Sequence, residues 1–121
     1  MISTNEETKK FQKELNAGTT ALVLLGVLGR TSKPMYGYQI AKLIEANAKD
    51  IPIMKLGALY PVLRSLESSG LLESEVEPSV SGPPRRYYRI TETGRETLGR
   101  WHGIWEQIKA LVDNVMSGGK Q

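Results

Sequence analysis

Residues 55–64 carry a lysine, a tyrosine and an arginine on the early turns of a predicted helix and read Lys-Leu-Gly-Ala-Leu-Tyr-Pro-Val-Leu-Arg. Such side chains can donate hydrogen bonds to phosphates or to the O6 and N7 atoms of guanine. The small residues between them would let a helix backbone approach a groove closely. The candidates for DNA contact on this helix are Lys55, Gly57, Ala58, Tyr60 and Arg64.

A second basic segment follows at residues 85–94, which read Arg-Arg-Tyr-Tyr-Arg-Ile-Thr-Glu-Thr-Gly. Alternation predicts a hairpin with strands over 71–77 and 85–91 and a loop over 78–84. Its register places Glu77 opposite Arg85 and Glu73 opposite Arg89, so ion pairs compete with DNA for these two arginines. Arg85 and Arg86 are phosphate candidates near the predicted tip, and Arg86 is the better placed because it has no acid opposite it.

Three candidates have structural alternatives that the sequence leaves open. Tyr60 could pack against the hairpin instead of facing DNA. Arg64 could pair with Glu67 three residues later. Tyr36, at the head of a predicted helix over 36–46, is either a further phosphate ligand or a core tyrosine, and Tyr38 competes for the same role.

Catalytic chemistry has little support. The chain has one histidine and no cysteine, so thiolate nucleophiles and zinc–thiolate sites are excluded. No His-plus-carboxylate set at ligand spacing surrounds His102, and no glycine-rich loop follows a strand. We expect no enzyme, no metal site and no cofactor.

The 121 residues suit one modest core, with a net charge of +3. Residues 19–70 carry six Lys or Arg against three Asp or Glu, so the positive excess lies in the predicted helical unit. The N-terminus is acidic and polar, unlike a signal peptide, and the longest apolar run, over 21–29, is far too short to span a bilayer. These features predict a soluble cytoplasmic protein with no membrane partner.

Hydrophobic spacing predicts a mainly α fold with a small β-hairpin. Helices are expected over 4–16, ending at Gly18, and over 19–30, 36–46 and 55–69, the last closed by Gly70. The predicted inward-facing residues of the later helices and of the hairpin are Ile40, Leu43, Ile44, Leu59, Leu63, Leu66, Leu72, Val76, Tyr88 and Ile90. A helix with exposed cations followed by a basic hairpin is the layout of a winged helix-turn-helix.

The last predicted helix begins at Thr91 or Thr93 and carries an apolar seam with steps of three and four residues. A seam this long cannot stay exposed on a small domain, so it predicts a homodimer. The chain then divides into a DNA-binding unit over 1–91 and a dimerisation helix and tail over 92–121. The predicted dimer contacts are Leu98, Trp101, Ile104, Trp105, Ile108, Leu111, Val112 and Val115. Trp101 and Trp105 either only pack there or also line a site for a planar aromatic ligand.

Four segments together resemble the PadR family of transcriptional regulators. They are Tyr-Gly-Tyr-Gln-Ile from Tyr36, Gly-Ala-Leu-Tyr-Pro-Val-Leu-Arg-Ser-Leu-Glu from Gly57, Gly-Leu-Leu from Gly70, and the basic strand from Arg85 through Thr-Glu-Thr-Gly. The resemblance covers about residues 19–98 and implies a winged-helix dimer that represses promoters. The single C-terminal helix is similar to the short-form subfamily, in which a tryptophan at the position of Trp105 stacks on flat aromatic compounds. Trp101, one turn earlier, departs from that pattern.

The resulting interpretation is a homodimeric repressor that binds double-stranded DNA at a pseudo-palindromic operator and is released by a planar aromatic molecule. The alternative is a winged helix that binds another protein and no DNA. The acidic outer side of the first hairpin strand (Glu73, Glu75 and Glu77) favours that alternative.

Overall fold

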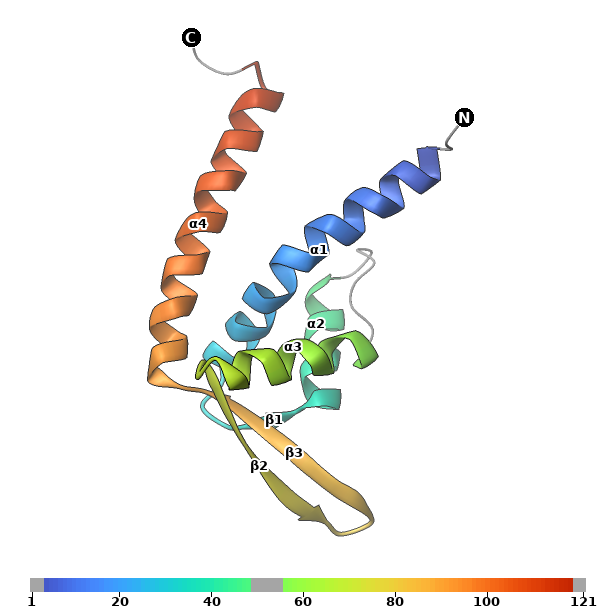
Figure 1. Ribbon diagram of the computed structural model, residues 1–121, viewed down its shortest axis with the longest axis vertical. Helices are drawn as coiled ribbons and strands as arrows, with labels where there is room; N and C mark the ends of the chain where they lie inside the picture. The colour runs from blue at the N-terminus through green and yellow to red at the C-terminus, as the bar shows by residue number, and fades with distance from the viewer. Residues whose placement is uncertain (1–3, 49–55, 119–121) are drawn as a thin grey trace.

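The computed structural model describes residues 4–48 and 56–118. Its elements in chain order are α1 (Thr4–Gly29), β1 (Met35–Tyr36), α2 (Gly37–Ala48), α3 (Leu56–Ser68), β2 (Leu72–Ser79), β3 (Gly82–Ile90) and α4 (Glu92–Met116). The three strands form an antiparallel sheet in the order β1-β3-β2. The two long helices, α1 and α4, meet near the sheet and diverge toward the two chain ends (Figure 1). The mainly α fold with a β-hairpin is as predicted.

The first helix is continuous, so the predicted break at Gly18 is wrong. A glycine inside a helix costs about 1 kcal/mol relative to alanine but keeps its backbone hydrogen bond, so it weakens a helix without ending it. The threonines that follow also bond back into the same helix. The Thr19 hydroxyl donates to the Leu15 carbonyl (3.0 Å), and the Thr20 hydroxyl donates to the Asn16 carbonyl (2.6 Å). The outcome is one 26-residue helix whose second half enters the core.

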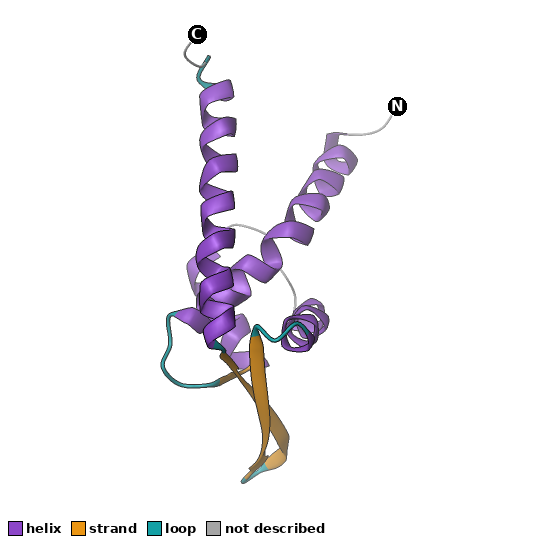
Figure 2. Ribbon diagram, turned by 60° about the vertical axis from the view of Figure 1, so that its left-hand side comes forward, coloured by secondary structure: helices purple, strands orange, loops and turns teal. Residues whose placement is uncertain are grey.

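The core lies where the second half of α1 meets α2, α3 and the base of the hairpin. Its buried residues are Leu24, Leu25, Leu28, Ile40, Ile44, Leu59, Leu63, Leu66, Leu71, Leu72, Tyr88 and Ile90. The leucine stripe of α3 is buried as predicted. Two predicted core residues are instead exposed: Leu43 by 42% and Val76 by 52%. Val76 lies opposite Arg86 on the hairpin, and the tip of the hairpin extends past the helices (Figure 2).

The hairpin follows the predicted register but is longer than expected. Leu72 pairs with Ile90, Glu73 with Arg89 and Glu77 with Arg85. Both strands continue into the segment predicted as a loop, which leaves only Val80 and Ser81 between them. The two-residue strand β1 was not predicted; it pairs Met35 with Tyr88 and Tyr36 with Tyr87. A strand this short has no alternation that a sequence could reveal.

A compact junction joins α3, the hairpin and α4. Gly70 ends α3 with a φ of 81°, as predicted, and the Leu71 amide donates to the Leu66 carbonyl (2.9 Å). Thr91 caps α4: its hydroxyl accepts from the Gly94 amide (2.9 Å) and donates to the Gly70 carbonyl (2.7 Å). The Thr91 amide also donates to the Leu71 carbonyl (3.1 Å).

We expect two glycines of α4 to respond to alanine in opposite directions. Gly103 is exposed on the side of α4 opposite the apolar seam, with open space around an added Cβ, so Gly103→Ala should stabilise the fold by about 0.5–1 kcal/mol. A Cβ at buried Gly94 would collide with the Leu71 carbonyl, so Gly94→Ala should cost about 1–3 kcal/mol. Urea denaturation of the two variants measures both changes in the free energy of unfolding. Equal changes would contradict the close contact between Gly94 and the Leu71 carbonyl.

Candidate nucleic-acid interface

The outer face of α3 is exposed while its inner face is buried. Gly57, Ala58, Tyr60, Pro61 and Arg64 are exposed, and the leucine stripe on the other side packs into the core. The helix thus presents small residues in its first turn and polar donors one and two turns later. Lys55, the remaining candidate on this segment, lies outside the described residues.

Arg64 makes no ion pair within the described parts of the chain. The alternative of a pair with Glu67 does not occur, and the Glu67 carboxylate instead accepts a hydrogen bond from the Ser74 hydroxyl of β2 (2.7 Å). Arg64 is therefore an exposed cation on the outer face of α3, available to a partner outside the chain.

Tyr60 joins α3 to the start of α2. Its side chain is 37% exposed. The ring lies against the buried backbone of Gly37, where a Cβ would come within 2.6 Å of the phenol oxygen. Because residue 37 is glycine, the ring can lie directly on the backbone at the start of α2, and any larger residue there would displace it.

An arginine and two tyrosines stack on the outer side of the sheet. The Tyr36 and Tyr87 rings meet edge to face, with centroids 5.3 Å apart, and the Arg85 guanidinium carbon lies 4.4 Å from the Tyr36 centroid. The Tyr36 amide donates to the Gln39 side chain (3.1 Å). Tyr36, the second residue of β1, is thus half-buried beside the hairpin, and Arg85 lies on its ring.

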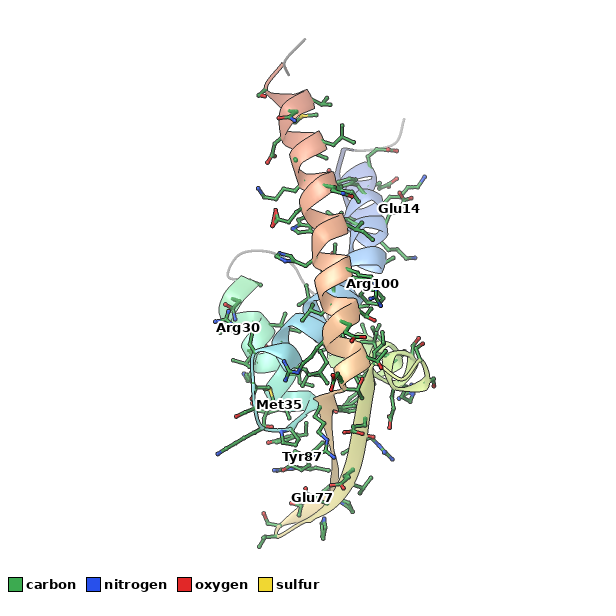
Figure 3. All side chains as sticks on the ribbon, turned by 90° about the vertical axis from the view of Figure 1, so that its left-hand side faces the viewer. Glu14, Arg30, Met35, Glu77, Tyr87 and Arg100 are labelled. Atoms are coloured by element: carbon green, nitrogen blue, oxygen red, sulfur yellow. The ribbon has the colours of Figure 1, made fainter. Side chains whose placement is uncertain are left out.

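The other two arginines of β3 have polar partners. Arg89 Nε donates to Glu73 Oε1 (2.7 Å), as predicted from the register, and this bond raises the pKa of the exposed Arg89 guanidinium above its ordinary value. Arg86 Nη1 donates to the Ser74 hydroxyl (2.9 Å), the same hydroxyl that reaches Glu67. Figure 3 shows Glu77 toward the hairpin tip and Tyr87 closer to the helices.

A groove between α1 and α4 holds the two tryptophans. Trp101 and Trp105 are half-buried and line a cavity of about 370 Å³ with Leu22 of α1 and Ile108 of α4. A neighbouring hollow of about 550 Å³ continues along α1 to Ala48 at the end of α2. Leu98 and Trp101 pack against the chain's own core. The apolar side chains farther along α4 are exposed: Ile104, Ile108, Leu111, Val112 and Val115.

The described residues offer no metal site and no membrane span. No group of three or more His, Cys, Asp or Glu side chains in them could hold a metal ion. None of the described helices is long and apolar enough to cross a membrane.

Comparison with known proteins identifies the family. Residues 24–100 match the model of the transcriptional regulator PadR-like family, a span that runs from the core half of α1 to the first turns of α4. The chain belongs to this family. Members are transcriptional regulators rather than enzymes, and the family implies DNA binding.

Relatives and solved structures agree with this PadR assignment. The chain is 31% identical over 86 residues to an uncharacterized protein of Lysinibacillus sphaericus, covering 71% of this chain and 79% of that protein. It is 43% identical over 56 residues to a transcriptional regulator of Mycobacterium tuberculosis, covering 46% and 51% of the two chains. A PadR family transcriptional regulator from Eggerthella lenta superposes with a TM-score of 0.75 at 33% identity, covering 93% and 94%. A transcriptional regulator from Clostridium thermocellum gives 0.73 at 26% identity, covering 83% and 95%.

Sequence reasoning missed two contacts of this PadR-family surface. The alternation of β3 places Arg86 and Tyr88 on one side, but nothing in it indicates that Ser74 would connect Arg86 to Glu67. The stacking of Arg85 on Tyr36 depends on the short strand β1, which brings residues far apart in the chain together.

We expect Gly37→Ala to destabilise the PadR fold by about 1–3 kcal/mol, because the new methyl group would overlap the Tyr60 ring. In a Tyr60→Ala background the ring is gone, so the same change should cost much less. Chemical denaturation of the two single variants and the double variant measures this coupling. Additive costs would show that Tyr60 is not what restricts this position.

Proposed function

We propose that this PadR-family chain is a homodimeric DNA-binding repressor that acts in the cytoplasm on a pseudo-palindromic operator. Each α3 would enter a major groove, with Lys55 near its start, Gly57 and Ala58 against the groove, and Tyr60 and Arg64 as donors. The observation that carries the proposal is the exposed outer face of α3, on which Arg64 has no ion-pair partner among the described residues. An exposed cation of this kind suits a phosphate or a guanine edge.

The hairpin would act as the wing, contacting the backbone or minor groove beside the site of α3. Arg85 and Arg86 supply its cations, and Tyr36 supports Arg85 from below. Because the outer arginine Arg89 is paired with Glu73, we assign it a structural role.

A second copy of the chain would cover the apolar seam of α4. The exposed side chains from Ile104 to Val115 form an apolar face, and its burial against a second copy would be favourable. Packing two such faces would bring two α3 helices to one side of a duplex. Half-sites about 34–36 Å apart, or a multiple of that distance, would then match the dimer. In this scheme residues 1–91 bind DNA and residues 92–121 hold the dimer together.

A planar aromatic molecule would release the repressor by entering the groove lined by Trp101 and Trp105. The groove is apolar and half-open, and stacking on an indole suits a flat ligand. The side chains of Glu14 and Thr19 at its edge supply polar contacts for a cationic one.

A second candidate function is a protein-binding module, favoured by the acidic edge strand β2. Glu75 and Glu77 are exposed there and make no ion pair within the described residues. An electrophoretic shift with the DNA upstream of the chain's own gene separates the two functions, because only the repressor would retard it.

Arg64→Ala should weaken binding to this upstream DNA by about 1–3 kcal/mol if the side chain contacts a guanine, or reduce the salt slope by about one per half-site if it contacts a phosphate. The matched control is Arg100→Ala, which removes the same charge from α4, away from the wing (Figure 3). Ultracentrifugation should give the wild-type mass for both variants. Unchanged affinity and salt slope for Arg64→Ala would contradict the role of α3.

Trp105→Phe should weaken binding of a planar aromatic cation. Binding is measured by adding the cation to the protein and following the fluorescence of the remaining tryptophan, and by calorimetry. We expect a loss of about 1 kcal/mol, the scale of one stacking contact. Trp101→Phe is the paired variant and tells which ring is used. If no planar cation quenches the fluorescence of the wild-type protein, the ligand is not of this class.

A further inference from the structure

A chain of two hydrogen bonds connects the wing to α3. Arg86 Nη1 on β3 donates to Ser74 Oγ on β2 (2.9 Å), and this hydroxyl donates to Glu67 Oε2 on α3 (2.7 Å). The hydroxyl has a single proton, and it points at Glu67. The Glu67 carboxylate and the Arg86 guanidinium are therefore both engaged, through one serine, in the angle between the helix and the hairpin.

Two cations, Arg86 and Arg64, and one carboxylate, Glu67, lie around the angle between α3 and the hairpin. Tyr88 is buried beneath it, and burial raises the pKa of its phenol above the ordinary value of 10.0, so the phenol is neutral at physiological pH. The charged groups that act on this phenol are Arg86, Glu67 and Arg64. Glu67 is also the only acidic residue of α3. The local charge is thus positive, and Glu67 reduces it.

The path of DNA gives this angle a function. If α3 occupies a major groove and the wing the adjacent minor groove, the phosphate strand between the two grooves must cross the angle between helix and wing. An anionic phosphate there would meet Arg86 and Arg64, and it would also meet the Glu67 carboxylate. The carboxylate and the phosphate are like charges that use the same donors.

We propose that Glu67 is a built-in competitor of the DNA phosphate: through Ser74 it holds Arg86 when no DNA is bound, and it thereby weakens binding to duplexes of any sequence. The proposal rests on the proposed function and adds to it a residue that limits non-specific affinity. Phosphate contacts carry no sequence information, so a carboxylate that opposes one acts equally on operator and random DNA. A residue that merely tethered the wing would instead strengthen binding.

Glu67→Gln tests this with little change of shape, because the amide oxygen can still accept from Ser74 while the charge is gone. Binding of the full chain is measured by fluorescence anisotropy on a random-sequence duplex and on the DNA upstream of its gene. We expect the variant to bind both roughly three- to tenfold more tightly than the wild type. Ser74→Ala, which cuts the connection without removing a charge, should also bind more tightly.

Two controls isolate the site. Glu75→Gln removes the same charge from the same hairpin, on a residue opposite Tyr87 rather than in the angle with α3, and should gain less than about twofold. In an Arg86→Ala background the gain from Glu67→Gln should shrink, because the competition is for Arg86. Thermal melts establish that each variant is folded.

The possible outcomes distinguish failure of this inference from failure of the proposed function on which it rests. If the wild type binds duplex DNA but Glu67→Gln and Ser74→Ala bind equally or more weakly, Glu67 is a structural tether and the inference is wrong while the repressor stands. An undiminished gain in the Arg86→Ala background would equally overturn it. If the wild type binds no duplex at all, the proposed function and the inference fail together.

Discussion

The Leu71 carbonyl is where α3 and the hairpin are joined to the long C-terminal helix. It accepts from the Thr91 amide, and the Gly94 backbone lies so close to it that no side chain fits between them. The same few residues end α3, pair the bases of β2 and β3, and cap α4. The direction of α4 relative to α3 is therefore set by backbone contacts rather than by long flexible side chains. In the proposed dimer, this direction would set the distance between the two α3 helices.

Burial of the second half of α1 supports that junction from the other side. Leu24, Leu25 and Leu28 are almost fully buried against α2, α3 and the sheet, and Arg95 of α4 donates to the Gly29 carbonyl at the end of the same helix (3.1 Å). The first half of α1 has no such cover, and Phe11 is 63% exposed. One helix thus serves both as the core of the domain and as one wall of the tryptophan groove.

The parts of the fold that the sequence predicted are those with a strong local signal. The leucine stripe of α3, the Gly70 stop and the hairpin register each depend on neighbouring residues or on strict alternation. The sequence left the start of α4 open between Thr91 and Thr93, and the structure has Thr91 as the cap. The break at Gly18 was predicted from a glycine alone, and helix continuity through burial of α1 outweighed it.

The contacts of the candidate interface depend more on tertiary packing, and fewer of them were predictable. Exposure of Arg64 followed from its place opposite the buried leucines. The partners of Tyr60 and Arg86 could not be predicted from the sequence. These partners, Gly37 and Ser74, lie on other elements, and only tertiary packing brings them close. Val76 was predicted to be buried because alternation indicates which side of a strand a residue faces, but not where the covering helix ends.

The position of β2 at the edge of the sheet has a consequence for solubility at high concentration. An uncovered edge strand offers free amides and carbonyls to any other strand, and it invites copies to join into extended sheets. Here the edge carries glutamates at 73, 75 and 77, and Pro78 removes one donor beside the irregularity between Glu77 and Ser79. Two such edges brought together would repel each other along their length. The glutamates of β2 therefore oppose aggregation of the protein through the edge of its own sheet.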